Sequence, residues 1–482
     1  MAVAQGTCPS CGAPIAFGVG SSIAKVCEFC RATVLRTDRG LANLGKVADL
    51  AHTPSLIAVG DQGTLGGRPF EVLGRVQLDH GLGPWDEYYV AFDYGQSWGW
   101  LAYAQGHWYV TTHVPNLPAP PYGSLRLEAD VSLGQTQYRV AELKTGTIRS
   151  AEGELPAAYP PGFVRYYADL YGPNSAFATL DYGDARSGHA VFLGWIFAEP
   201  QMQVTQIGPR TQHKVKLDHI RCPNCGGEVP KLSGDRAERI GCPYCGAVSD
   251  IAAQQVVAQQ EKALKQPDIP IGARGTFEGH EYIAIAYVRR GTDFDGEHYA
   301  WEEYLLWAQA IGFRWLVNDP ESGFSWVTPV NLSDLDLRGT PEQVTWGRRV
   351  FSMRNQNTAR VEYVLGEVYW KCQIGETTQA SDFTNGRDVL SREESAGEVH
   401  WSYSAPIAWP LLAQAFGLPV NGPGGQSRHA GSTPQGGMSS AAILLILIVI
   451  VLVICMFGAC GSCADGAVGG SSRGGGVFYG GK

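Results

Sequence analysis

The feature that most constrains this chain is a pair of cysteine motifs that occurs twice. The first copy reads Cys8-Pro-Ser-Cys11-Gly and then Cys27-Glu-Phe-Cys30, and the second reads Cys222-Pro-Asn-Cys225-Gly and then Cys242-Pro-Tyr-Cys245-Gly. Two CxxC turns supply four thiolates, which is the tetrahedral ligand set that zinc prefers, and four protein ligands leave no open position for water. We therefore predict two structural zinc sites, with the ligands Cys8, Cys11, Cys27 and Cys30 in one and Cys222, Cys225, Cys242 and Cys245 in the other.

Two other states of these cysteines compete with zinc. Iron in a rubredoxin-like site uses the same four thiolates. Disulfides require an oxidising compartment, and no secretory signal is recognisable before Cys8, so we expect thiolates on the reducing side of a membrane. The Cys27 turn departs from the pattern, since it lacks both the proline and the following glycine.

A second repeated pattern follows each cysteine set. Gly63-Thr64-Leu65 and Trp85-Asp86-Glu87-Tyr88 in the first copy match Gly275-Thr276-Phe277 and Trp301-Glu302-Glu303-Tyr304 in the second. Short aromatic and aliphatic runs alternate with turn residues, for example over 282–288, 299–307, 313–317 and 324–328. Such runs predict an antiparallel sheet, sandwich or barrel. The fold class is therefore mainly β, with two repeated modules that each combine a zinc ribbon with an antiparallel β domain.

The domain boundaries follow from these patterns. We predict zinc ribbon 1 at 7–40, β domain 1 at 55–210, zinc ribbon 2 at 216–250, β domain 2 at 268–418, a disordered linker at 419–440, a transmembrane helix at 441–458 and a Gly-rich disordered tail at 464–482. A short helix is also predicted after each ribbon: at 41–50 from apolar residues at helical spacing, and at 251–265 from a run rich in Ala, Gln, Val and Lys that Pro267 ends.

The membrane prediction rests on an uncharged apolar run near the end of the chain. About eighteen residues at ~1.5 Å each span roughly 27 Å, enough for the hydrocarbon core. With thiolate sites on the N-terminal side, this predicts a single-pass protein of the inner membrane with a cytoplasmic body. Cys455, Cys460 and Cys463 lie at the predicted membrane exit, where acylation, pairing or ordinary packing are alternatives.

Net charge narrows the choice of partners. The formal charge is −9, and around the second ribbon basic and acidic residues balance, so a nucleic-acid partner is disfavoured. The partners we predict are the membrane, a protein and, as an open alternative, a small-molecule ligand.

Several other residues invite a functional interpretation. Asp86-Glu87 and Glu302-Glu303 lie beside a tryptophan in both copies, but neighbours on a strand point to opposite faces, which favours a structural role over a catalytic pair. Glu154 and Glu367 share a Gly-Glu context, for which we favour a strand or turn role. Cys372 is predicted to be a buried thiol. No phosphate-binding loop, dinucleotide fingerprint or nucleophile elbow is present.

The order Gly-Thr-Leu/Phe, Trp-Glu-Glu-Tyr-Leu-Leu, Phe-Arg-Trp-Leu-Val, Phe-Ser-Trp-Val-Thr and Gly-Glu-Val-Tyr-Trp resembles the bacterial DUF4178 family, a domain of unknown function. Residues 272–415 carry the pattern well, and 60–200 resemble a diverged copy in which Tyr89 replaces a leucine. Members of this family tend to be fused to zinc ribbons and encoded beside polyamine-synthesis and small membrane proteins. The resemblance thus implies a membrane-associated accessory or stress-related role and no established chemistry.

Two functional hypotheses follow. The first is a non-catalytic binding or scaffold protein that presents two zinc-ribbon β modules to a partner. The second is an enzyme or accessory subunit with a cleft between the modules for a polar or cationic metabolite, lined by Glu303 and Glu367. A pocket that collects those two carboxylates would favour the second hypothesis.

Overall fold

The computed structural model describes residues 4–17, 22–37, 40–46, 56–79, 84–104, 107–184, 188–198, 201–206, 219–233, 237–251, 254–260, 266–294, 296–309, 312–395 and 397–420. Strands dominate this part of the chain, and α1 (Trp409–Phe416) is its one α-helix. The mainly β prediction is confirmed.

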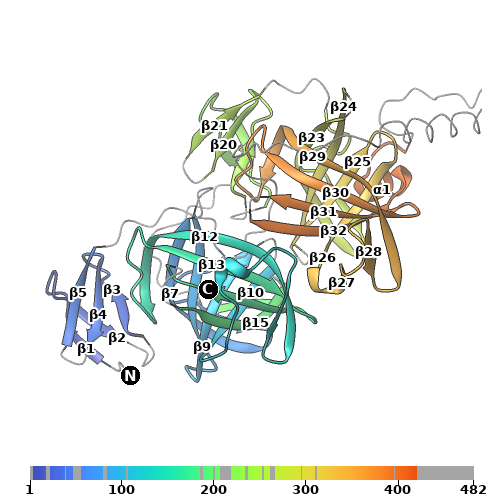
Figure 1. Ribbon diagram of the computed structural model, residues 1–482. Coiled ribbons are helices and arrows are strands. Elements are labelled where there is room, and N and C mark those ends of the chain that lie inside the picture. Colours follow the sequence, from blue (N-terminus) through green and yellow to red (C-terminus); the bar gives the residue numbers. More distant parts are fainter. Residues whose placement is uncertain are drawn as a thin grey trace, which may run out of the picture. The chain divides into compact units, whose positions relative to one another are not determined.

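Each cysteine set belongs to a small β unit. We call the first unit ribbon 1; its strands are β1 (Ala4–Thr7), β2 (Pro14–Phe17), β3 (Ala24–Val26), β4 (Ala32–Thr37) and β5 (Gly40–Lys46), drawn in blue in Figure 1. Ribbon 2 consists of β17 (His219–Arg221), β18 (Glu228–Pro230), β19 (Arg239–Gly241), β20 (Ala247–Asp250) and β21 (Gln255–Gln259). In both ribbons a two-stranded hairpin precedes a three-stranded antiparallel sheet, and each CxxC motif lies in the turn of a hairpin.

The helices predicted at 41–50 and 251–265 are wrong within the described residues. β5 and β21 occupy these places and pair with β4 and β20 as the third strand of each ribbon. Backbone pairing along a neighbouring strand outweighs the helical spacing of the apolar residues, and the adjacent β-branched Val256 and Val257 favour a strand. Residues 47–50 and 261–265 lie outside the described part.

Barrel 1, as we name the first β domain, closes on itself through antiparallel pairing. Among the described residues, its ring contains eight strands in the order β7 (Arg68–Asp79), β8 (Pro84–Phe92), β9 (Ser97–Ala104), β10 (His107–Val114), β15 (Ala190–Ala198), β14 (Ala176–Asp181), β13 (Val164–Tyr171) and β12 (Thr136–Leu155), which returns to β7. Shorter strands pair around the ring: β6 (Gln62–Leu65) joins β7 and β16 (Met202–Gln206), and β11 (Asp130–Leu133) joins β12. The single-turn helix η1 (Tyr122–Ser124) lies between β10 and β11 in the chain.

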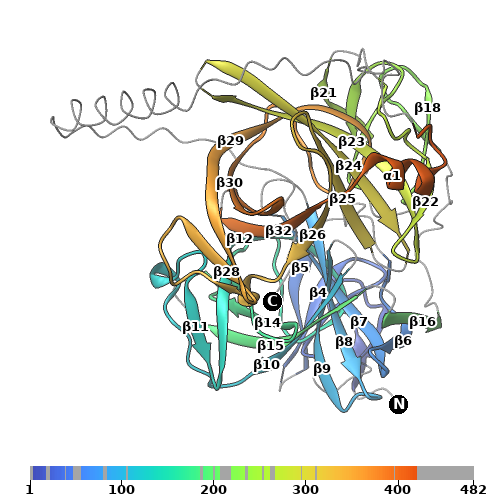
Figure 2. The same ribbon diagram turned by 90° about the vertical axis from the view of Figure 1, so that its right-hand side faces the viewer.

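Barrel 2 repeats the same ring. Its strands run β23 (His280–Phe294), β24 (Glu297–Ala308), β25 (Gly312–Asp319), β26 (Gly323–Val330), β32 (Glu398–Pro406), β31 (Asp388–Ser395), β30 (Thr377–Asn385) and β29 (Arg349–Val368), which returns to β23. Figure 2 shows this ring, with β23–β25 in yellow and β29, β30 and β32 in orange. The accessory elements are β22 (Arg274–Phe277), η3 (Leu332–Asp334), β27 (Leu335–Asp336) and β28 (Gln343–Trp346). The predicted strand runs of the second copy lie in β23–β26.

One long strand connects each barrel to its ribbon. Past the ring, β12 pairs with β3 of ribbon 1, and β29 pairs with β19 of ribbon 2. At the crossing point Gly153 and Gly366 adopt φ of 73° and 81°. A side chain at either position would collide with the carbonyl oxygen of the neighbouring strand, at Leu73 and Ile285 respectively. The repeated glycine therefore marks where the strand leaves the ring.

Barrel 2 is completed by α1. Leu412 and Phe416 pack with Tyr282 and Trp326 in the barrel core, and Gly417 ends the helix in the left-handed conformation. The ring of Phe416 lies so close to Gly275 that a side chain there would displace it, which explains the glycine in the second copy of the motif. At Gly63, in the first copy, a side chain would instead collide with the carbonyl oxygen of Gln203 on β16.

The predicted inner-membrane localisation is wrong. No helix in the described residues is long and apolar enough to cross a membrane, and α1 has only eight residues. The predicted linker, spanning segment and tail, at 419–440, 441–458 and 464–482, lie beyond the described residues except for 419–420.

Candidate metal centres and buried acids

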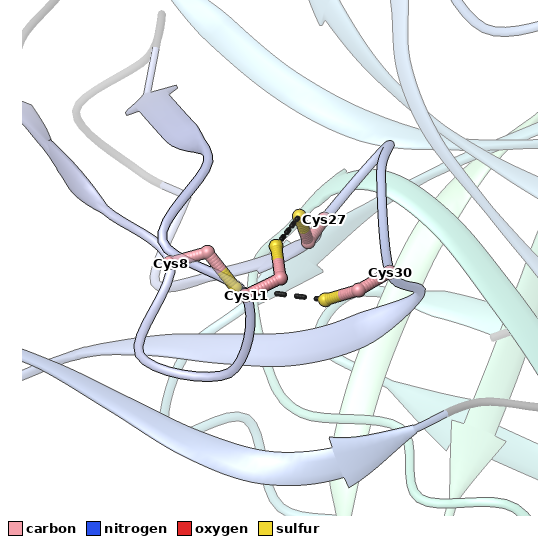
Figure 3. Close-up of side chains that lie close together, drawn as sticks. All are labelled: Cys8, Cys11, Cys27 and Cys30. Atoms are coloured by element: carbon pink, nitrogen blue, oxygen red, sulfur yellow. Dashed lines mark hydrogen bonds between the residues drawn. The ribbon is translucent and has the colours of Figure 1, made fainter.

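The structure brings the eight predicted cysteines together in two sets of four. In each set the sulfur atoms all lie within 4.8 Å of one another. In ribbon 1, Cys8 and Cys30 are 3.7 Å apart and Cys11 and Cys27 are 3.8 Å apart, measured between Sγ atoms (Figure 3). In ribbon 2 the corresponding distances are 3.7 Å for Cys222–Cys245 and 3.8 Å for Cys225–Cys242.

These distances fit a tetrahedral metal site. A tetrahedron with zinc–sulfur bonds of about 2.3 Å has edges of about 3.8 Å, whereas a disulfide would place two sulfurs about 2.05 Å apart. All eight cysteines are free thiols here. The donor set is compatible with zinc, and either set could hold one ion.

Backbone geometry holds the sulfurs in place. The N–H of the residue after each motif donates to the carbonyl oxygen of its first cysteine, as in Gly12 to Cys8 and Arg31 to Cys27. The donating residue has positive φ in all four turns, and three of the four are glycines. Arg31, at φ 60°, is the exception. The missing glycine noticed in the sequence is thus a strained position of ribbon 1.

Local hydrogen bonds favour the thiolate form of one cysteine in each ribbon. The backbone N–H of Ala32 lowers the pKa of Cys30 to about 6. Burial opposes ionisation of Cys245, but the backbone N–H of Ala247 and the amide of Asn224 outweigh it and lower that pKa to about 7. Thiolates are the form that binds a metal.

The acids in the Gly-Glu motifs attach the ribbons to the barrels. Glu367 is buried and accepts hydrogen bonds from the backbone N–H groups of Leu232 and Ser233 and from the Ser233 hydroxyl, all in the segment after β18. Glu154 lies 3.5 Å from the ammonium of Lys25 on β3. Both acids thus contribute to the contact between a ribbon and its barrel.

The paired acids beside the tryptophans separate to opposite faces, as the strand period requires. On one face, Asp86 accepts from Arg75 and Gln77, and Glu302 accepts from Tyr287 and Asn318. On the other face, Glu87 and Glu303 are buried. The predicted structural role agrees with these contacts.

Glu303 is part of an ionic cluster in barrel 2. The guanidinium of Arg290 lies 3.3 Å from Glu303 and 3.4 Å from Glu393, and the indole N–H of Trp301 donates to Glu303 at 2.7 Å. Burial raises the pKa of Glu303, while Arg290 opposes this shift. Glu303 and Glu367 are therefore held by different partners.

Sequence reasoning missed Arg290 and a second group of buried acids, Glu142 and Asp169 in barrel 1. Arg290 lies two residues after the apolar run 282–288, and a charged residue so close to such a run could have been recognised in the sequence as a candidate buried cation. Cys372, predicted to be buried, is fully buried in the apolar core of barrel 2.

Taken together, two four-cysteine ribbons, each attached to a closed antiparallel barrel, define a tandem ribbon–barrel protein. The chain belongs to the DUF4178 family, described as a domain of unknown function, whose model matches residues 58–196 and 270–408. These two ranges cover more than half of the chain and begin after each ribbon. Neither a curated protein nor a solved structure matches the chain.

Proposed function

We propose that both cysteine sets bind zinc and that the two ions are structural. Four sulfur donors at tetrahedral spacing support this, because a complete protein ligand set leaves no coordination position for a substrate. Cys8, Cys11, Cys27 and Cys30 would hold one ion, and Cys222, Cys225, Cys242 and Cys245 the other.

The function that the geometry supports best is that of a non-catalytic binding protein, whose two ribbons contact a protein partner. The observation that carries this proposal is an exposed aromatic residue at the same place in both ribbons. Phe29 and Tyr244 each precede the last cysteine of a set, and they are 70% and 57% exposed. Aromatic residues at such positions are enriched in protein interfaces.

The alternative of an enzyme that uses Glu303 and Glu367 has less support. Glu367 accepts three hydrogen bonds from ribbon 2, and Glu303 is paired with Arg290 and Trp301. A carboxylate already used in such contacts is a poor general acid or base, because proton transfer would disrupt the packing.

Site-specific crosslinking tests the binding proposal. A photoreactive amino acid would replace Phe29 or Tyr244 in the full chain, with Tyr94 as the matched control, since it is 92% exposed but belongs to the turn between β8 and β9. We expect one protein to crosslink at both ribbon positions and not at Tyr94. The purified partner should then bind the wild-type chain and lose affinity for the Phe29→Ser/Tyr244→Ser variant. Equal crosslinking at all three positions, or unchanged affinity of that variant, would contradict the proposal.

A further inference from the structure

Barrel 1 and barrel 2 meet where β12 lies beside β32. The backbone N–H of Leu143 donates to the carbonyl oxygen of Gly397 at 2.7 Å, and Glu142 is the Cα partner of Glu398. The contact therefore includes a backbone hydrogen bond and places two carboxylates opposite each other.

A third acid extends this pair into a row. On the other side of β12, Glu142 is the Cα partner of Asp169 on β13. Asp169, Glu142 and Glu398 are 0%, 1% and 3% exposed. Three carboxylates thus lie on three adjacent strands, away from water. Like charges at directly opposite positions destabilise a sheet, and burial adds a desolvation penalty.

The cation in this row is Lys144. Its ammonium lies 3.0 Å from Glu142 and contacts Glu398 as well. The Thr179 hydroxyl donates to Oδ1 of Asp169 at 2.6 Å, but Oδ2 of Asp169 and Oε2 of Glu142 have no hydrogen-bond partner among the described residues. The titratable groups that act on the row are Lys144 from β12, Tyr167 and Tyr171 from β13, Glu398 and His400 from β32, Glu87 from β8, Tyr109 from β10 and Tyr122 from η1.

Three carboxylates and one ammonium leave the row with excess negative charge, which a metal ion or a proton could neutralise. The spacing of the acids disfavours a metal ion. Among the described residues, the side chains whose donor atoms converge within 4.8 Å are those of the two cysteine sets, and the carboxylate row is not among them. A proton needs no such convergence, because it binds a single carboxylate oxygen. Buried acids in this situation generally take up a proton.

We propose that the Asp169–Glu142–Glu398 row is a proton-binding site that couples the contact between the two barrels to pH near neutrality. Asp169 is protonated in both states. With a further proton on Glu142, Lys144 neutralises Glu398, the remaining carboxylate, and the row packs against β32. Without it, two carboxylates face each other across the β12–β32 contact with one ammonium between them, and the contact weakens.

The titration behaviour agrees with this geometry. Burial raises the pKa of Glu142 to about 7. The Lys144 ammonium opposes this shift, and the Glu398 carboxylate adds to it. Burial and the Glu142 carboxylate also raise the pKa of Asp169 well above its usual range. A carboxyl whose pKa is higher in the folded state stabilises that state at low pH, and the stabilisation is lost as pH rises through about 7.

Hydrogen exchange of the full chain tests the proposal at pH 6 and pH 8, after correction for the intrinsic rates. For one proton with a pKa near 7 in the closed contact, linkage predicts a fall of about tenfold in the protection of segments 140–146 and 397–401 between these pH values. Glu142→Gln should keep its protection at both pH values, because a neutral side chain of the same shape replaces the titrating one. Glu398→Gln provides a second test, since Lys144 then pairs with Glu142 alone and the pH dependence should disappear.

Glu128→Gln is the matched control at the same contact, where Glu128 binds Arg392 and Trp401. It should lower protection equally at both pH values. A pH dependence that persists in Glu142→Gln would overturn the proposal. So would the restoration of wild-type protection at pH 8 by millimolar Mg²⁺ or an alkylammonium salt, because a cation would then be the occupant of the row.

Discussion

The rings of barrel 1 and barrel 2 have the same order of strands, but the acids inside them are paired with cations from different strands. Leu78 and Arg290 occupy equivalent positions on the first strand of each ring. Leu78 is paired with Trp85 and Ile148, and Arg290 is paired with the corresponding residues Trp301 and Val361. In barrel 2, Arg290 reaches both Glu303 and Glu393. In barrel 1, the cation comes from another strand.

That other cation is Arg165 on β13, which pairs with Asp181, the counterpart of Glu393. Barrel 2 has Thr378 at the place of Arg165. Equivalent positions of the two rings therefore carry acids, but different strands supply the positive charge.

The ribbons should depend on separate metal ions. Cys222→Ser should lower the zinc content from two ions per chain to one and unfold ribbon 2 alone, because metal binding supplies most of the folding free energy of such small units, roughly 10–16 kcal/mol. Cys8→Ser should do the same to ribbon 1. Metal analysis and hydrogen exchange of each ribbon measure the outcome. Cys372→Ala is the control and should keep both ions; a loss of both ions from either ribbon variant would show that the sites are coupled.

Arg290→Leu introduces the residue of barrel 1 into barrel 2. It leaves the buried Glu303 and the partly exposed Glu393 without their cation. Because Glu303 then is an uncompensated buried charge, we expect a loss of about 3–5 kcal/mol in the unfolding free energy of barrel 2. Denaturant unfolding, with hydrogen exchange to localise the effect, is the measurement. Arg289→Leu removes a half-exposed partner of Glu362 and should cost less than about 1 kcal/mol. Equal losses in the two variants would refute the assigned role of Arg290.

The attachment of the ribbons should differ in strength. Glu367→Gln weakens three hydrogen bonds to a buried carboxylate and should cost about 2 kcal/mol. Glu154→Gln replaces one ion pair with Lys25, at 3.5 Å, by a neutral side chain of the same shape and should cost less. Protection of β19 and β3 against hydrogen exchange reports the two contacts. If Glu154→Gln had the larger effect, the ion pair and not the hydrogen bonds would hold the ribbons.

Arg31→Gly should stabilise ribbon 1, because glycine adopts the positive φ of this turn without the penalty of about 1 kcal/mol that a side chain incurs. The measurement is the chelator concentration at which ribbon 1 releases its metal, which should rise. The converse change in ribbon 2, Gly246→Ala, should lower the corresponding concentration, since a side chain there collides with the carbonyl oxygen of Gln260. No change in the first variant would mean that Arg31 is unstrained.

Local patterns allowed much of the molecule to be predicted. The four CxxC turns, the two repeated modules and strands such as β24 and β26 depend on residues close together in the chain. The third ribbon strands were mistaken for helices although their pairing partners β4 and β20 directly precede them in the chain. Residue spacing and composition were given more weight than the possibility of a further hairpin. The membrane localisation was inferred from the hydropathy of 441–458, which lies outside the described residues, whereas no helix among the described residues is long and apolar enough to cross a membrane.

The charged row at Glu142 could not be predicted for a different reason. A register shift in β12 between Val140 and Glu142 decides which residue lies opposite Asp169, and Glu398 reaches this place from a distant part of the chain. Neither the register shift in β12 nor the contact with Glu398 can be recognised from the alternation of polar and apolar residues.

The Gly-Glu step at the ends of β12 and β29 also matters for engineering. The ribbon precedes its barrel in the chain, but the glycine and glutamate that receive it lie on a barrel strand about a hundred residues later. A chimera that exchanges only the ribbons would therefore place a foreign ribbon against an acid from another docking surface, and Gly153-Glu154 or Gly366-Glu367 with its neighbours must be adapted separately.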